Sequence, residues 1–243
     1  MLGAYDIHRY ANDEHVRAGK LREYFAEAWN YARAHDLAAG AKPCIVGEAG
    51  RNTRAKHPRG NLDIDAYAYG VFMADYATQA ANAGSAAVMA WMLDDNSHAG
   101  FFWGMWTNRQ KGLELRPWFY PWSLLCRCFP RGARIVRTRV ASGDVRVLAA
   151  CKVDAAPRAG ASWSFCLVNR ADTPAAVRLA VKGGARAVMS RYVYAEGARR
   201  ADANGFPKPM DRRTYDLRRR VNVECEPNSV TILTTIAEPA TPE

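Results

Sequence analysis

The chain has 243 residues, enough for one large domain or two ordinary ones with a real hydrophobic core. Hydrophobic residues make up 49% and charged residues 24%, which is an ordinary composition for a globular protein. Every apolar stretch is interrupted before the roughly 18 residues that a helix needs to cross a bilayer, so we expect no membrane partner. The N-terminal sequence MLGAYDIHRYAND lacks the basic start and apolar middle of a signal peptide.

The formal net charge of +10 comes almost entirely from arginine, because seven lysines leave 27 arginines among the 34 basic residues. The densest clusters, Arg199-Arg200, Arg212-Arg213 and Arg218 to Arg220, lie among acidic residues and turn signals. Segments that bind nucleic acid usually concentrate their charge on one face or in one tail. We therefore expect an arginine-rich solvated surface and no nucleic acid partner.

The six cysteines lack the paired CxxC spacing of a zinc site. Cys126 and Cys128 would point to different faces of a helix, and His57 and His98 have no partner at metal-ligand spacing. We therefore expect no metal. We expect the cysteines to be small buried residues, and a disulfide in the C-terminal half remains an alternative. No glycine-rich phosphate loop or Gly-x-Ser-x-Gly elbow occurs, so we expect no cofactor and no serine-hydrolase chemistry.

The chain begins with an alternation of strand and helix. Residues 3–10 are predicted as a strand. Between Leu21 and Ala32, apolar residues then recur at steps of three and four, which predicts an amphipathic helix. After Lys42-Pro43, the run Cys44 to Gly47 predicts a second strand.

A second helix is predicted to begin near Asn61 or Asp63, because either side chain can cap a helix. Asp65 would then fall in the first turn, where the helix dipole favours an acidic residue. The pattern continues to about Gly84.

A third strand over 86–93 is apolar throughout, as expected of a strand buried on both faces, and a last helix covers roughly 117–129. Three strand–helix units in succession predict a parallel sheet. A closed barrel needs eight strands, and three alone would leave unprotected edges. Residues 1–130 are therefore expected to be the last three βα units of a (β/α)8 (TIM) barrel.

The second half of the chain changes to a period of two. Val177, Leu179 and Val181 alternate with small or charged residues, and so do Val221 and Val223. The second half contains about eight short apolar runs, each separated from the next by a cluster of turn residues. This arrangement is typical of antiparallel sandwiches. We therefore predict an antiparallel β-sandwich over residues 131–243 and a fold of class α/β plus all-β.

In parallel barrels the reactive side chains lie at the C-terminal ends of the strands. The polar and aromatic residues expected there are His8, Tyr10 and Asn12 after the first strand, Glu48 after the second, and Trp91, Asp94, Asp95 and Asn96 after the third.

This ordered set resembles the large clan A type of retaining glycoside hydrolases, which are built on (β/α)8 barrels. In those enzymes the nucleophilic glutamate often lies in a short Gly-Glu-small-Gly motif at the end of the seventh strand, and Gly47-Glu48-Ala49-Gly50 is similar. His8-Arg9-Tyr10 resembles the His-x-Tyr that ends the sixth strand, where the tyrosine hydrogen-bonds the nucleophile. Trp91 resembles the eighth-strand tryptophan that floors the sugar subsite.

The resemblance extends along nearly the whole chain, although each motif is short. The stretch from Arg116-Pro117 to Arg131-Gly132 resembles the final barrel helix and its exit. Residues 227–233 resemble the last strand of the sandwich that such enzymes append to the barrel.

The resemblance also implies an acid/base glutamate that follows an asparagine at the end of the fourth strand. No Asn-Glu pair occurs in this chain, and by this alignment its position would precede Met1. Asp94 or Asp95 is a less favoured candidate for the residue that protonates the leaving oxygen. We therefore expect a fragment of a retaining glycoside hydrolase that is inactive as an isolated chain, with a coding sequence that extends upstream.

A retaining glycosidase needs one carboxylate to attack the anomeric carbon and a carboxyl group about 5–5.5 Å away to protonate the leaving oxygen. A tyrosine that donates to the nucleophile favours its ionised form, and an indole offers a stacking surface to a sugar ring. We accordingly assign Glu48 as nucleophile, with Tyr10 and His8 in support. The expected substrate-binding residues are Trp91, Asp94, Asp95 and Asn96.

Simpler interpretations remain for each of these residues. Glu48 could be a solvated loop carboxylate, His8 a structural histidine, and Trp91 part of a core. The loop after residue 93 and the aromatic run 101–106 could bind sugar or merely be solvated and packed.

The expected partner is an oligo- or polysaccharide, and the alternative function is a non-catalytic carbohydrate-binding or scaffolding protein on the same fold. Secretion would suit an enzyme that acts on a polysaccharide. The sequence indicates neither the sugar nor an oligomeric state.

Overall fold

The computed structural model describes residues 3–36, 38, 42–52, 61, 63–96, 100–140, 143–153, 161–182 and 184–238. His57 and His98 lie outside these ranges. The contacts divide the chain into two compact units, residues 1–122 and 123–243, and the division falls within helix α4 (Phe119–Cys128). None of the described helices is long and apolar enough to span a membrane.

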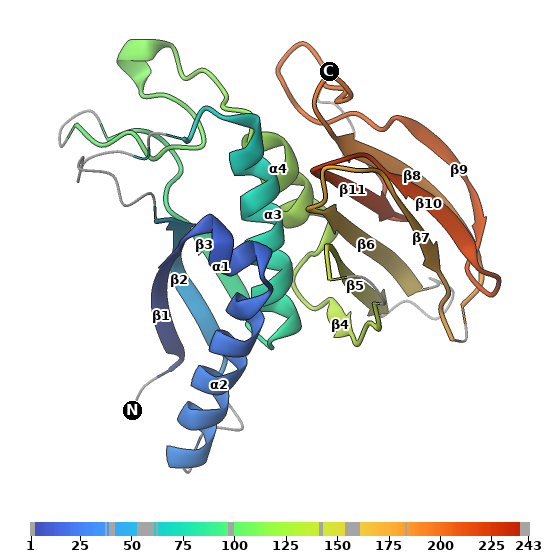
Figure 1. The fold of residues 1–243 in the computed structure, drawn as a ribbon, viewed down its shortest axis with the longest axis horizontal. Helices are drawn as coiled ribbons and strands as arrows, with labels where there is room; N and C mark the ends of the chain where they lie inside the picture. Colours follow the sequence, from blue (N-terminus) through green and yellow to red (C-terminus); the bar gives the residue numbers. More distant parts are fainter. Residues whose placement is uncertain are drawn as a thin grey trace. The chain divides into compact units, whose positions relative to one another are not determined.

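The N-terminal unit is built on a parallel sheet of three strands in the order β1 (Tyr5–Ala11), β2 (Cys44–Arg51) and β3 (Ala87–Ala90). Its helices are α1 (Asp13–Arg17), α2 (Lys20–His35) and α3 (Tyr67–Asn82), which follow the strands along the chain as Figure 1 shows. A short 3-10 helix, η2 (Arg109–Lys111), lies in the long segment before α4. The predicted alternation of parallel strands and helices is confirmed.

Helix α2 has the predicted apolar face. Its Leu21, Phe25 and Trp29 are at most 1% exposed, and the rings of Phe25 and Trp29 stack with their centroids 5.9 Å apart. The indole Nε1 of Trp29 donates to Ser85 Oγ at 3.1 Å, which satisfies the only polar atom of that side chain. The helix therefore packs through the face that the sequence pattern indicates.

Helix α3 is buried along most of its length and holds the unit together. Its Gln79 donates to the backbone oxygen of Val16 in α1 and accepts from the backbone N–H of Arg22 in α2. Because Gln79 is nearly fully buried, these bonds offset the cost of removing its amide from water.

Two expectations for this region are wrong. Helix α3 begins at Tyr67 after Ala66, without a side-chain cap, because Asn61 and Asp63 form a preceding turn. Asp65 likewise precedes the helix, and its carboxylate accepts a hydrogen bond from Arg116.

The third strand is shorter than predicted and is not buried on both faces. In β3 the exposed residues Ala87 and Met89 alternate with the half-buried Val88 and Ala90. The described helices cover one face of the sheet, where Val46 is fully buried, and Met89 on the other face is 48% exposed.

The C-terminal unit contains two antiparallel sheets. Their strands are β4 (Arg134–Val136), β5 (Val145–Val153), β6 (Ala161–Asn169), β7 (Ala175–Leu179), β8 (Arg186–Tyr194), β9 (Asp211–Asp216), β10 (Val221–Cys225) and β11 (Ser229–Thr234). Six strands form one sheet in the order β4-β5-β6-β11-β8-β9, and β10 and β7 form the other (Figure 1).

The period-two pattern correctly identifies the strands of the smaller sheet. Val177 in β7 lies opposite Val223 in β10. Val223 belongs to a hydrophobic core that also includes Leu167 and Leu233 of the larger sheet, and the partly buried Val177 packs against this core. Strand alternation therefore directs apolar side chains of both sheets into one core.

The cysteines are all free thiols. Cys128 is buried while Cys126 is exposed, as expected of neighbours on different faces of a helix. Burial raises the pKa of Cys225 to about 11, so this thiol stays protonated at neutral pH.

Candidate functional site

A β-bulge in the middle of β2 decides where Glu48 points. The register pairs Ile7 with Val46 but then pairs His8 with Glu48, so that Gly47 is an extra residue on β2. Side chains alternate along a regular strand, so without the extra residue Glu48 would share the helix-covered face with Val46. The bulge instead places Glu48 on the open face, beside His8.

Both oxygens of Glu48 have partners on β1. The hydroxyl of Tyr10 donates to Glu48 Oε2 at 2.8 Å, and His8 Nδ1 lies 3.3 Å from Glu48 Oε1. Partial burial, together with the hydrogen bond to Glu48 and its negative charge, raises the pKa of Tyr10 well above its usual value. Tyr10 therefore remains a proton donor to the carboxylate at every pH of interest.

Asp6 is a member of this cluster that the sequence did not indicate. Its Oδ2 lies 3.5 Å from His8 Nε2, so the imidazole of His8 lies between two carboxylates. Asp6 and His8 are two residues apart on one strand and therefore share a face. The available signal was this spacing on a strand that already carried His8 and Tyr10.

The two glycines of the Gly-Glu-Ala-Gly motif make room for the β1 side chains. A Cβ atom on Gly47 would lie 2.8 Å from Asp6 Cγ, and one on Gly50 would lie 2.9 Å from Cε1 of Tyr10. Real Cβ atoms essentially never come this close to another heavy atom, so each glycine lets a β1 side chain lie against the backbone of β2.

Trp103 packs at the edge of the cluster. Its ring lies edge-on to the ring of Tyr10, with the centroids 5.6 Å apart and an interplanar angle of 77°. The aromatic run 101–106 thus contributes at least one side chain to the neighbourhood of Glu48.

Trp91 follows β3, and its backbone N–H donates to the carbonyl of Ala49 at 2.9 Å. Strand alternation places its half-buried side chain on the same open face as Met89. The structure therefore places Trp91 at the end of the third strand, on the open face of the sheet to which Glu48 also belongs.

The loop after Trp91 differs from the expected row of sugar ligands. Asp94 and Asn96 are exposed, but Asp95 is 3% exposed and forms a two-pronged ion pair with Arg116, at 2.9 Å for each nitrogen–oxygen contact. Asp95 Oδ1 also accepts from the backbone N–H of Gly104. Its oxygens bind protein donors, so Asp95 holds the loop and does not face solvent.

Arg116 is the second residue near the candidate site whose contacts the sequence did not indicate. Its guanidinium contacts Asp95 and Asp65 and donates to the backbone oxygens of Gly104 and Trp106. Although its partial burial acts to lower the pKa of Arg116, the two carboxylates raise it. No local pattern links these residues, because they are up to 51 positions apart.

Asn12 has a structural function. Its side-chain oxygen accepts from the backbone N–H of His15 and so caps helix α1. Within the described ranges, no three His, Cys, Asp or Glu side chains come together as a metal ion would require.

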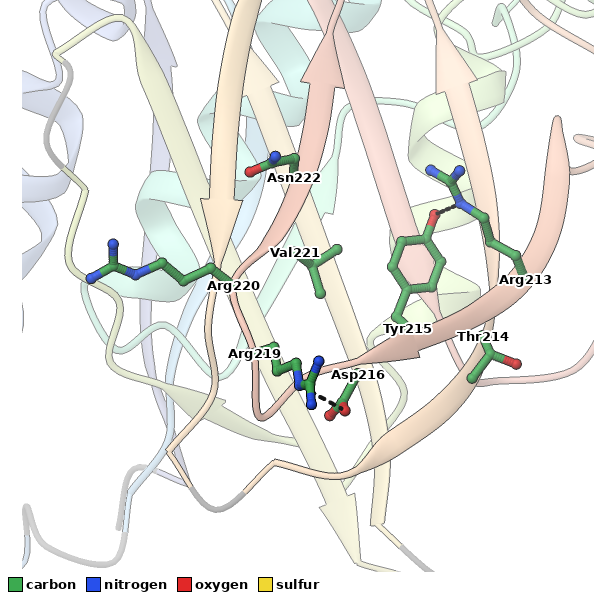
Figure 2. A pocket seen from close by; sticks show the side chains of 8 residues that line it. All are labelled: Arg213, Thr214, Tyr215, Asp216, Arg219, Arg220, Val221 and Asn222. Atoms are coloured by element: carbon green, nitrogen blue, oxygen red, sulfur yellow. Dashed lines mark hydrogen bonds and ion pairs between the residues drawn. The ribbon is translucent and has the colours of Figure 1, made fainter.

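A small hollow of about 360 Å³ opens in the C-terminal unit at the turn from β9 to β10 (Figure 2). Four of its polar side chains bind each other, since Arg213 Nε donates to the hydroxyl of Tyr215 at 2.8 Å and Arg219 pairs with Asp216. Hydrogen bonds from Arg218, together with its charge, hold the pKa of the Asp216 carboxyl at about 2.

No protein-family model matches the chain, and no curated protein matches its sequence. Solved structures match its fold. The GH51 α-L-arabinofuranosidase of Thermotoga petrophila RKU-1 aligns with a TM-score of 0.68 at 13% identity, over 96% of this chain and 53% of that one. The α-L-arabinofuranosidase of Thermotoga maritima aligns with a TM-score of 0.62 at 11% identity, over 96% and 52%.

A monomeric β-xylosidase of Caulobacter crescentus CB15 aligns with a TM-score of 0.58 at 10% identity, over 96% of this chain and 56% of that one. The chain thus has a fold found in glycoside hydrolases and spans about half the length of these three. At such low identities the likeness concerns the fold alone.

Proposed function

We propose that the chain is part of a retaining glycoside hydrolase and that Glu48 is its nucleophile. In this proposal residues 1–130 are the last three βα units of a (β/α)8 barrel, and residues 131–243 are an appended β-sandwich. The likeness in fold to arabinofuranosidases and a xylosidase, over half their lengths, supports this organisation.

The observation that carries the proposal is the environment of Glu48. Its carboxylate lies in the C-terminal half of the parallel strand β2, accepts a hydrogen bond from Tyr10 and has His8 beside its other oxygen. Parallel α/β folds place reactive groups at the C-terminal ends of their strands. A solvated loop carboxylate would need neither two partners nor a bulge that turns it toward them.

The reaction follows from these positions. One oxygen of Glu48 attacks the anomeric carbon while the bond from that carbon to the leaving oxygen breaks, which gives a glycosyl ester on Glu48. An acid/base residue outside this chain protonates the leaving oxygen and later removes a proton from the water that hydrolyses the ester. Tyr10 and His8 hold the carboxylate, and Trp91 and Trp103 offer stacking surfaces to the sugar ring.

Asp95 does not fit the role of proton donor, because both its oxygens bind Arg116. The exposed side chains Asp94 and Asn96 are better placed to bind sugar hydroxyls. The substrate we propose is an oligo- or polysaccharide, and secretion would bring the enzyme to it. One structural neighbour is a conserved exported protein of Bacteroides fragilis, which agrees with that location.

Covalent labelling of Glu48 tests the proposal. The chain, expressed with any in-frame coding sequence upstream of Met1, is incubated with a panel of activated fluoroglycosides, and peptides are analysed by mass spectrometry. An activated leaving group departs without acid assistance, so labelling requires only the nucleophile and a sugar site. We expect a glycosyl mass increase on the peptide that contains Glu48, and none in Glu48→Gln.

Two outcomes would contradict the assignment. Labelling of another carboxylate in both proteins would move the nucleophile elsewhere. Sugar binding without any labelling across the panel would favour a non-catalytic carbohydrate-binding protein on the same fold.

A further inference from the structure

Asp6 has no part in the reaction proposed for Glu48, yet its carboxylate belongs to the same cluster. Its Oδ2 lies 3.5 Å from Nε2 of His8, while Oε1 of Glu48 lies 3.3 Å from Nδ1 of the same ring. The three side chains therefore form a row in which one imidazole lies between two carboxylates.

Strand pairing produces this row. Asp6 and His8 are two residues apart on β1, so their side chains point to the same face of the sheet. The bulge in β2 then brings Glu48 to that face, where it is the register partner of His8. The order of the three groups is thus fixed by the backbone.

Gly47, the extra residue of the bulge, also affects Asp6. A Cβ atom at this position would overlap both carboxylate oxygens of Asp6, so the carboxylate occupies space that a side chain would otherwise fill. The glycine that turns Glu48 toward one nitrogen of His8 therefore also lets Asp6 reach the other nitrogen.

The two carboxylates share one basic partner. In the described part of the chain, His8 is the basic side chain within ion-pair distance of Asp6 and of Glu48. The arginines of the two strands, Arg9 and Arg51, instead lie over aromatic rings of helices α2 and α3. Strand β3 contributes no charged residue to the sheet. The charge balance of the row therefore depends on His8.

The position of His8 between two carboxylates favours one protonation form of its ring. An ionised carboxylate only accepts hydrogen bonds, and so does a ring nitrogen that carries no proton. Each neutral form of the imidazole would turn one such nitrogen toward a carboxylate. The form with a proton on both nitrogens is the one that can donate to Asp6 and Glu48 together.

Building on the function proposed for Glu48, we propose that Asp6 is a positioning residue that acts on the nucleophile through His8. Asp6 accepts from Nε2 of His8 and so favours the form that keeps a proton on Nδ1. Nδ1 then donates to Oε1 of Glu48, while the hydroxyl of Tyr10 donates to Oε2. Two donors thereby hold the carboxylate in one orientation for attack on the anomeric carbon.

The first test measures the protonation of His8 in the whole chain. The nitrogen resonances of its imidazole, assigned with His8→Gln, distinguish the doubly protonated ring from each neutral form. At about pH 6.5, Asp6→Asn should raise the ratio of neutral to protonated His8 about two- to fivefold, as expected for loss of a half-exposed ion pair. The matched control is Asp63→Asn, because the side chain of Asp63 is also 46% exposed but pairs with Arg51. It should leave that ratio unchanged.

The second test measures how fast activated fluoroglycosides label Glu48, in the protein expressed with any in-frame upstream sequence. At about pH 7.5, Asp6→Asn should slow labelling about two- to fivefold. At about pH 5 the variant should label as the wild type does, because His8 is then protonated without help from Asp6. In a His8→Gln background, Asp6→Asn should no longer slow labelling, because the residue through which it acts is gone. Circular dichroism verifies that each variant is folded.

Three results would overturn the function of Asp6. They are an unchanged ratio of neutral to protonated His8 in Asp6→Asn, an equal slowing of labelling at both pH values, and an equal slowing with and without His8. If wild-type Glu48 were not labelled by any fluoroglycoside of the panel, the function proposed for the chain would fail instead. The His8 resonances would then decide by themselves whether Asp6 controls the imidazole.

Discussion

The carboxylate of Asp6 occupies the space in which a side chain at position 47 would begin, because a Cβ atom there would lie 2.8 Å from Asp6 Cγ and closer still to its oxygens. Gly47→Ala should therefore displace Asp6 from His8. An Asp side chain can rotate away, so we expect a loss of less than about 1 kcal/mol in unfolding free energy. The imidazole resonances of His8, assigned with His8→Gln, should shift clearly, while those of His35 should not.

Gly104→Ala provides the opposite case. A Cβ atom on Gly104 would overlap backbone atoms of Asp94, Asp95 and Trp106, which cannot rotate away. We expect a loss of about 1–3 kcal/mol or more, measured by urea denaturation. If the two alanine variants had equal stability, the contrast between side-chain and backbone crowding would be wrong.

Tyr10→Phe removes the hydrogen bond to Glu48 and keeps the ring that packs on Gly50 and Trp103. Without this bond the carboxylate loses the contact that orients it toward the anomeric carbon, so the rate of fluoroglycoside labelling should fall about ten- to hundredfold. The control is Tyr76→Phe, which removes a bond to the backbone oxygen of Arg9. It should reduce stability but leave the labelling rate unchanged, and an equal effect of both variants would point to general loosening.

Asp95→Ala should strongly destabilise the N-terminal unit. The substitution leaves the guanidinium of Arg116 buried without its main partner, and breaking such a pair costs about 3–5 kcal/mol. Asp94→Ala, at the exposed neighbouring position, should change stability by less than about 0.5 kcal/mol. Chemical denaturation measures both values, and similar losses would show that the pair with Arg116 adds little.

Asp36 gives the fold an acid-sensitive contact. Its hydrogen bonds with Lys42, Tyr5 and the backbone of Ala38 lower its pKa from 3.8 to about 2. Because the folded state prefers the ionised form, this contribution is present above about pH 4 and is lost as the pH falls toward 2. Asp36→Asn should thus be less stable than the wild type at neutral pH, and the two stability curves should converge near pH 2 in urea titrations.

Sequence periodicity predicted the main elements because it reports which side chains meet a core. The steps of three and four identified the buried face of α2, and the alternation of valines identified β7 and β10 as strands of one unit. The length of β3 was overestimated, because an apolar run does not reveal that one sheet face is left uncovered.

The candidate site was only partly predictable. Regular alternation from Val46 would direct Glu48 toward the helices, and only the resemblance to a Gly-Glu motif suggested otherwise. The bulge at Gly47 moves the side chain of Glu48 to the other face of the sheet. It depends on pairing between strands, which a single sequence does not display. The pairing of Asp95 with Arg116 depends in the same way on how a long loop closes, so the buried aspartate could not be told from its exposed neighbour Asp94.

The open face of the β1–β2–β3 sheet has an electrostatic consequence for Glu48. In the described structure the side chains of His8 and Asp6 are 54% and 46% exposed, so water screens the charges of the cluster. Any segment that covered this face would exclude that water and lower the local dielectric constant. The same three side chains would then interact more strongly without moving, so the reactivity of the carboxylate would depend on assembly around it.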